Sequence, residues 1–169
     1  MRITLDPVER NDSQILMNLL EKYACEFSQY DGRDVNAQGL YHDDGWLDFF
    51  WNLEHRWAYF IRVDGQLAGF VMVNDYPETK SAPCDYCLTE FFVLHKYRRM
   101  GVGSYAARTV WEQFHGFWQL MLHPNNLASV SFWKKAVSDY TNGAYQTVTD
   151  CPDAQYEDGT PAVVYLFQN

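Results

Sequence analysis

The sequence lacks the features that would place the chain in a membrane or in the secretory pathway. Its longest apolar run, Leu67–Val73, has seven residues, whereas a membrane-spanning helix needs about 20. The first residues, MRITLD, do not form the apolar core of a secretory signal, and the chain becomes charged by Glu9 and Arg10. We therefore expect a cytoplasmic protein with no membrane partner.

Positive charge is also scarce, with 13 Lys and Arg against 22 Asp and Glu and a formal net charge of −9. Because affinity for a phosphate backbone comes from clustered Lys and Arg, this balance argues against nucleic acid as a partner. Apolar material is plentiful, since 47% of the 169 residues are hydrophobic and 17% are aromatic. This composition excludes intrinsic disorder and predicts one domain over residues 1–169.

The chain has only four cysteines, which we expect to be reduced thiols in a cytoplasm: Cys25, Cys84, Cys87 and Cys151. A structural zinc site would need a second ligand pair beside Cys84 and Cys87, and none follows. A thioredoxin-like dithiol would stand at the start of a helix, whereas a strand pattern follows here. We interpret the pair as incidental thiols in a loop and expect no metal.

The hydrophobic pattern predicts the element order β-α-α-β-β-β-α-β-α-β-β. Strands are expected at Met1–Leu5, Trp57–Val63, Gln66–Asn74, Leu88–Leu94, Phe117–Leu122, Ala144–Thr149 and Pro161–Phe167. Helices are expected from the cap Asn11-Asp12-Ser13 to Phe27, over Asp44–Leu53, after Arg98–Ser104, and from Leu127 to about Tyr140, with a loop at Ser28–Gly39. Asp64-Gly65 suits a tight hairpin turn. The strand–helix–strand unit at 88–122 implies one parallel pair in a mostly antiparallel sheet, hence a mixed α/β or α+β domain.

A glycine loop, Arg98-Arg99-Met100-Gly101-Val102-Gly103-Ser104, lies between a strand and the start of a helix. Its backbone amides can converge on an anion, which the helix N-terminus also favours. Lys96, Arg98, Arg99, Arg108, Lys134 and Lys135, six of the 13 basic residues, lie in this segment and the next helix. The loop lacks the Gly-Lys-Ser/Thr ending of a Walker A loop and the third glycine of a dinucleotide fingerprint. It therefore indicates a phosphate-bearing ligand of another kind, although a solvated basic face remains the alternative.

The sequence from about Leu88 to Tyr140 resembles the GCN5-related N-acetyltransferase (GNAT) superfamily. The family's acyl-CoA loop has the form Arg/Gln-x-x-Gly-x-Gly/Ala after the fourth strand, and Arg98 to Gly103 match it. The family also carries an Asn at the start of the next helix, followed six and seven residues later by an aromatic pair. Asn126, Phe132 and Trp133 have that spacing, with Ala128 between them. The predicted element order is also that of the family, so the resemblance implies a GNAT-like domain.

By this resemblance the cofactor is acetyl-CoA, which serves as the acyl donor. The strand residues Phe91 to Val93 would meet the pantetheine arm and the thioester, and the amides from Arg99 to Ser104 would wrap the pyrophosphate. An N–H aimed at the thioester oxygen would stabilise the charge of a tetrahedral intermediate. Asn126 would bond the cofactor arm or cap its helix. The implied cofactor-binding residues are Phe91, Phe92, Val93, Arg98, Arg99, Met100, Gly101, Val102, Gly103, Ser104, Asn126 and Trp133.

Acetylation of an amine requires a base, because a lysine-like amine with a pKa of about 10.4 is almost wholly protonated at neutral pH. Glu90 is the candidate, since many GNAT members carry a glutamate on that strand. The alternative is a strand carboxylate that faces solvent or forms a salt bridge. His95 and His123 border the same region, and we interpret both as exposed or loop histidines rather than as catalytic groups.

The leaving thiolate needs a proton, which the family often takes from a Tyr at the position of Trp133. An indole N–H is not a useful acid, so Ser129, Ser131, Tyr140 or water would replace it. Trp133 is expected to pack against the cofactor or the core.

Evidence on the acceptor comes from residues 1–60, which hold 11 acidic and five basic side chains. Asp44 and Asp48, one helical turn apart, lie in sequence near Tyr41, Trp46 and Trp51, which would suit a cationic amine unless these aromatics are core.

We expect an N-acetyltransferase acting on a primary amine of a small molecule in a ternary complex. The alternatives are a catalytically silent acyl-CoA-binding module and a general nucleotide-phosphate binder. Many family members dimerise, and the aromatic content permits a homodimer.

Overall fold

The structure is a computed structural model that describes residues 1–43 and 45–169. Its order of strands and helices agrees with the prediction. The strands are β1 (Ile3–Pro7), β2 (Arg56–Val63), β3 (Gln66–Asn74), β4 (Tyr86–Val93), β5 (Phe117–Leu122), β6 (Gln146–Val148) and β7 (Val163–Gln168). The helices are α1 (Ser13–Asp31), α2 (Asp48–Asn52), α3 (Val102–Gln113) and α4 (Leu127–Thr141).

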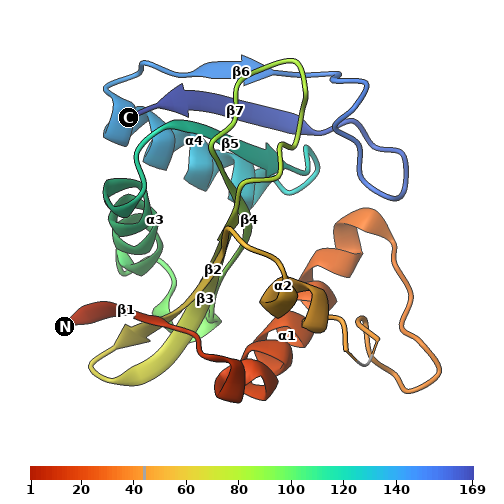
Figure 1. Ribbon diagram of the computed structural model, residues 1–169. Helices are drawn as coiled ribbons and strands as arrows, with labels where there is room; N and C mark the ends of the chain where they lie inside the picture. The colour runs from red at the N-terminus through yellow and green to blue at the C-terminus, as the bar shows by residue number, and fades with distance from the viewer. Residues whose placement is uncertain (44) are drawn as a thin grey trace.

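All seven strands form one sheet in the order β1-β2-β3-β4-β5-β7-β6. The β4–β5 pair is parallel, as predicted from the crossover through α3, and the other neighbours are antiparallel. Asp64 and Gly65 have φ angles of 49° and 79°, as a primed hairpin turn requires. In Figure 1 the strands β5, β7 and β6 run across the direction of β2, β3 and β4, so the sheet has two differently directed halves. This is a mixed α/β domain.

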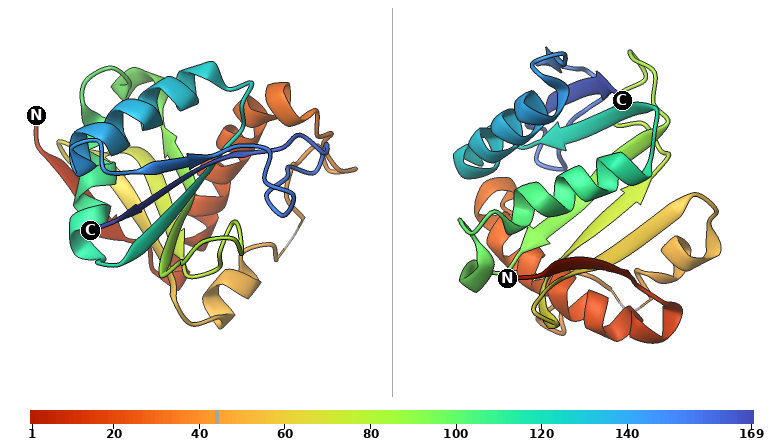
Figure 2. Two further views of the ribbon diagram at one scale, coloured as in Figure 1. Left: turned by 90° about the horizontal axis from the view of Figure 1, so that it is seen from above. Right: turned by 90° about the vertical axis from the view of Figure 1, so that its left-hand side faces the viewer.

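Helices cover both faces of the sheet (Figures 1 and 2). On one face, α1 and α2 bury Leu16, Leu20 and Phe50 against Phe60 and Phe70 of the central strands. The opposite face carries α3, whose side chains continue into a second core shared with α4, β5 and β7. Six aromatic side chains are buried in that core: Tyr59, Trp111, Trp118, Trp133, Tyr165 and Phe167. The aromatic surplus of the sequence is therefore mainly core material.

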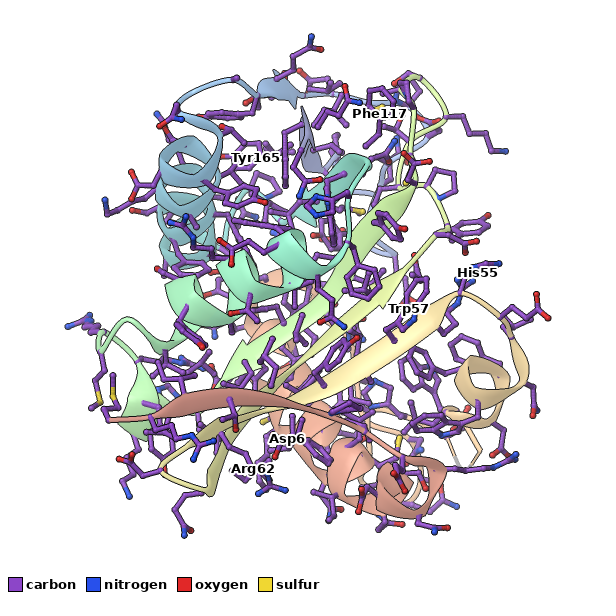
Figure 3. All side chains as sticks on the ribbon, turned by 60° about the vertical axis from the view of Figure 1, so that its left-hand side comes forward. Asp6, His55, Trp57, Arg62, Phe117 and Tyr165 are labelled. Atoms are coloured by element: carbon purple, nitrogen blue, oxygen red, sulfur yellow. The ribbon has the colours of Figure 1, made fainter. Side chains whose placement is uncertain are left out.

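The open edge of the sheet is held by polar contacts. Arg62 Nε of β2 lies 2.8 Å from Asp6 Oδ2 of β1, and Figure 3 shows the two residues side by side. Further along β2, Trp57 packs against Phe114 beyond α3, with ring centroids 4.8 Å apart. The ion pair thus links β1 to β2, and the aromatic contact links β2 to the end of α3.

Several element boundaries differ from the predictions. The first helix continues to Asp31 through part of the expected loop, because Gly32 with φ 69° supplies a left-handed cap whose N–H bonds to Ser28 O. The second helix is shorter than Asp44–Leu53 and spans Asp48–Asn52, while Asp44 itself lies outside the described residues. Cys87 is fully buried within β4 rather than in a loop, with its Sγ 3.2 Å from that of Cys84. Among the helices described, none is long and apolar enough to cross a bilayer.

Candidate active site

A cleft of about 1300 Å³ opens where β4 and β5 separate. The two strands pair only at Tyr86–Trp118 and Cys87–Gln119. Beyond Cys87, β4 keeps its partner β3 on one side and faces the cleft on the other. Backbone groups of a strand that has lost its neighbour remain available to a ligand. The cleft is therefore bordered by the part of β4 in which the sequence predicted the site.

A bulge in β4 determines which side chains face this cleft. Met72 of β3 pairs with Glu90 and Val73 pairs with Leu88, so Thr89 is the extra residue. Without the bulge, residues two apart would share a face of the sheet. With it, Leu88 joins the core beneath α3 and α4, whereas Glu90 lies beside Met72 on the face that α1 covers. The bulge thus turns the predicted base toward α1.

Glu90 lies in an environment that favours its neutral form. Loss of water around the side chain raises its pKa to about 7, and the nearby Glu78 carboxyl contributes in the same direction. A hydrogen bond with Tyr23 of α1 and the charge of Arg33 both act in the opposite direction. Burial likewise raises the pKa of Glu78 to about 7. A carboxyl with a pKa near neutrality is suited to exchange protons with an amine.

The glycine loop forms a tight turn at the start of α3. Arg99 and Gly101 both have positive φ, 60° and 80°, and the first bond of the helix runs from Tyr105 N to Gly101 O. The amides of Val102, Gly103 and Ser104 precede that bond, so the helix itself does not use them. A Cβ at Gly103 would lie 3.1 Å from Cζ of Phe132 and 3.7 Å from Cε1 of Phe91. A side chain at this position would therefore press on the ring of Phe132, while the three free amides of the turn remain available to an anion.

The side chain of Arg98 forms hydrogen bonds with other parts of the protein. Its Nε donates to Val93 O at 2.6 Å, and one terminal nitrogen donates to Glu26 of α1 at 2.8 Å. The guanidinium also lies over the ring of Phe92 at 5.4 Å. These contacts tie the end of β4 to α1, and the expectation that Arg98 also binds the cofactor stays a prediction. Arg98 and Arg99 both line the cleft, and Arg99 and Met100 are exposed.

On the opposite side of the cleft, α4 presents Asn126, Phe132 and Trp133. Asn126 caps its helix, since its Oδ1 accepts from Ser129 N at 3.1 Å. Trp133 is buried, with its ring 4.8 Å from that of Phe91, so it belongs to the core and to the cleft wall at once. Both predicted alternatives for Trp133 are therefore compatible with its position.

The groups considered as replacement acids for the leaving thiolate differ in whether they line the cleft. Ser129 lines the cleft. Tyr140 packs on Trp111 and its hydroxyl accepts from Asn169 at 2.9 Å, on the far side of α4. Ser131 is exposed on that helix. Within the described lining of the cleft, neither Tyr140 nor Ser131 is present.

The two histidines differ from each other. His95 is exposed and its Nε2 lies 2.8 Å from Glu26, which agrees with an exposed histidine. His123 follows β5 in a loop, as expected, but it is only 1% exposed and lines the cleft.

The expected acceptor patch is only partly assembled. Tyr41 and Trp46 line the cleft, but Asp48 and Trp51 are not among its described lining residues, and Asp44 lies outside the described part of the chain.

Sequence reasoning missed four residues of the site, Tyr23, Arg33, Glu78 and Tyr156, all of which line the cleft. They come from the middle of α1, the loop after it, the β3–β4 loop and the β6–β7 loop. No spacing links them, because only the fold brings them together. Among the described residues, no group of three or more His, Cys, Asp or Glu could hold a metal ion.

The fold and the cleft agree with comparisons to known proteins. The model of the acetyltransferase (GNAT) family matches residues 15–137. A search of curated proteins found no match. Among solved structures, an acetyltransferase from Thermus thermophilus has a TM-score of 0.69 at 14% identity, covering 100% of this chain and 98% of its own. The aminoglycoside acetyltransferase AAC(6')-Ib with coenzyme A has a TM-score of 0.67 at 16% identity, covering 99% and 95%.

A third neighbour is the ribosomal-protein-S18-alanine N-acetyltransferase of Escherichia coli, with a TM-score of 0.62 at 13% identity, covering 99% of this chain and 94% of its own. Identities this low show the fold alone, whereas the family model covers most of the chain. The strand order, the cleft beside β4 and the glycine turn before α3 are consistent with that match. The chain therefore belongs to the GNAT acetyltransferase family and is an acyl-CoA N-acyltransferase that acts on amines.

Proposed function

We propose that this enzyme transfers an acetyl group from acetyl-CoA to the primary amine of a small molecule, which attacks directly while both are bound. The observation that carries this proposal is the position of Glu90, which the β4 bulge turns into the cleft where β4 leaves β5. Arg99 and Gly103 of the glycine turn line the same cleft. One opening therefore holds a candidate base and a candidate phosphate site.

The glycine turn fits the phosphates of coenzyme A. The amides of Val102 to Ser104 would hold the pyrophosphate, with the partial positive charge of the α3 N-terminus behind them. Gly103 lines the cleft, so the backbone of the turn borders the opening in which the cofactor would lie. The backbone of Phe91 to Val93, on the open side of β4, would bond the pantetheine arm, and Nδ2 of Asn126 could join it while Oδ1 caps α4. When bound, acetyl-CoA supplies an activated thioester.

Glu90 would act as the general base, directly or through one water. With a pKa of about 7, roughly half of its carboxyl is ionised at neutral pH and able to take a proton from the ammonium group. Tyr23 would hold the carboxylate toward the cleft through their hydrogen bond.

No strong acid is needed for the thiolate. Since an ordinary thiol has a pKa of about 8.5, the sulfur can leave as an anion and take its proton from water. The described lining of the cleft offers Ser129 beside Trp133 on this side.

The acceptor end of the cleft favours a small cationic amine. Glu78, Glu90 and Glu157 line it together with the rings of Phe27 and Tyr156. Carboxylates attract an ammonium group, and aromatic faces hold it by cation–π contact. A structural neighbour, AAC(6')-Ib, has been solved with coenzyme A and kanamycin, which supports a small-molecule acceptor.

A thermal-shift titration with acetyl-CoA, with coenzyme A, ATP and NAD as controls, tests the cofactor. A ligand at about 100 times its dissociation constant should stabilise the fold by about 2.7 kcal/mol. Thiol release with a panel of amines then tests the reaction. Binding without release on any amine would favour the silent acyl-CoA-binding module, and protection by ATP or NAD instead would favour a nucleotide binder.

A further inference from the structure

His123 is held by its loop in one tautomer. The residue lies directly after β5, is 1% exposed and lines the cleft. Its Nδ1 receives the backbone N–H of Asn125 at 3.2 Å. A ring nitrogen that accepts a hydrogen bond carries no proton, so the neutral imidazole has its proton on Nε2. The fold thereby fixes Nε2 as a hydrogen-bond donor.

That donor has no partner within the described part of the chain. The carboxylate of Asp158 is 3.9 Å from Nε2, which is too far for a hydrogen bond. Both oxygens of Asp158 already accept from Thr160, one from its N–H at 2.8 Å and one from its hydroxyl at 2.7 Å. Because buried polar groups are nearly always paired, an unpaired donor in the wall of a cleft indicates a ligand atom.

The surroundings of His123 limit the kind of ligand. Three rings flank the imidazole, those of Phe27 at 5.9 Å, Tyr30 at 6.1 Å and Tyr156 at 4.6 Å between centroids. The guanidinium of Arg33 lies over the ring of Phe27 at 5.9 Å and is paired with Asp31, and the other charged groups that line this side of the cleft include the carboxyls of Glu78, Glu90 and Glu157. These would repel an anionic oxygen, so a neutral hydroxyl, ether or amide oxygen is favoured.

We propose that His123 is a specificity-determining residue whose Nε2–H binds a neutral oxygen of the acceptor. The acceptor is then an amine that also carries a hydroxyl, ether or amide oxygen, rather than a plain alkylamine or an amino acid with a free carboxylate. This inference rests on the proposed acetyl transfer to a small amine. His123 would thus bind the acceptor at a second point, in addition to the carboxylates that would bind its ammonium group.

Matched pairs of amines test the proposal with the full chain and acetyl-CoA. Ethanolamine, propanolamine and butanolamine are compared with propylamine, butylamine and pentylamine, in which a methyl group replaces the hydroxyl. A hydrogen bond that satisfies a buried donor should raise kcat/KM by about 5- to 150-fold for at least one amino alcohol over its partner.

Two variants of His123 separate this role from a structural one. In His123→Asn the side-chain oxygen can still accept from Asn125 N–H, but no atom remains at the position of Nε2. We expect the preference to fall below about twofold, because kcat/KM for the amino alcohol falls much further than kcat/KM for the alkylamine. His123→Gln places an amide donor near the position of Nε2 and should retain part of the preference.

Three results would overturn the proposal: no preference in any wild-type pair, an equal loss on both members of each pair in His123→Asn, or a change confined to KM for acetyl-CoA. If no amine is acetylated, the proposed function fails, and the same pairs are then compared by thermal shift. In addition, NMR of protein carrying nitrogen-labelled histidine reads the tautomer without turnover. For the neutral ring an Nε2–H tautomer is expected, and an Nδ1–H tautomer would refute the inference.

Discussion

Replacing Glu90 by Gln should make the protein less active and more stable. The neutral amide has nearly the shape of the carboxyl but does not ionise. Because the pKa of Glu90 is raised from 4.5 to about 7, its charged form is less favourable in the fold than in the unfolded chain. The stability lent by the neutral carboxyl is present below its unfolded pKa and is lost as pH rises through about 7. The Glu90→Gln side chain does not ionise, so the variant keeps its stability as pH rises.

The magnitude follows from the shift in pKa. Each unit corresponds to about 1.4 kcal/mol, so the ionised carboxyl destabilises the fold by about 3 kcal/mol at about pH 8 and by about 1 kcal/mol at about pH 5. We therefore expect Glu90→Gln to gain about 3 kcal/mol over the wild type at the higher pH and much less at the lower pH.

Urea denaturation at both pH values measures this difference, and Glu112→Gln is a suitable control because Glu112 is exposed and paired with Arg108 four residues earlier. The control should change the free energy of unfolding by no more than about 0.5 kcal/mol.

Activity gives the second readout. Wild-type kcat/KM should rise with pH through about 7, whereas the variant should lose about 100-fold or more near neutral pH and recover as the free amine becomes abundant. Equal stability of the variant and the wild type at the higher pH would refute the electrostatic reasoning, and an unchanged pH profile would remove Glu90 from the mechanism.

Three further substitutions test other parts of the site. Gly103→Glu should leave a folded protein by circular dichroism but abolish the thermal shift with coenzyme A, because a bulky, negatively charged side chain would lie beside the amides of the glycine turn, next to Phe132; normal binding would show that the turn is not the phosphate site. Tyr23→Phe removes the hydrogen bond that lowers the pKa of Glu90, so the pH–rate profile should move to higher pH, and an unmoved or opposite shift would contradict this role. Gly69→Ala drives a Cβ into the backbone oxygen of Phe92 in β4, so unfolding experiments should show a loss of about 3 kcal/mol or more, and a loss under about 1 kcal/mol would mean that β3 and β4 separate easily.

The fold could be predicted from local patterns because each element carries its own signal. Strand Phe117–Leu122 was found with its correct ends, since its nearly continuous apolar run is typical of a strand covered on both faces. The error at α1 has a physical cause. The polar residues Ser28–Asp31 were interpreted as loop, but the left-handed Gly32 was the informative signal for the helix end.

The residues of the site also differ in whether the sequence could predict them. Glu90 and the glycine turn lie in continuous segments, so a motif could place them on the chain. The direction of Glu90 could not be read, because it depends on the bulge at Thr89, which only the pairing with β3 reveals. Glu78 and Tyr156 were invisible for another reason, since they lie in separate loops that tertiary packing brings to one cleft.

The buried amide of Gln119 has a consequence for the design of new variants. Fully buried on β5, it accepts from Thr79 N and donates to the carbonyl oxygens of Thr79, Ala82 and Pro83, with distances of 2.9–3.3 Å. The β3–β4 loop is thus anchored through its main chain, which every sequence shares. Glu78, a side chain of that loop that lines the cleft, can be exchanged without removing this anchor, whereas the buried hydroxyl of Thr79 also bonds Asp153 at 2.9 Å and should be kept. Libraries confined to this loop should retarget the enzyme to other acceptors while keeping its scaffold.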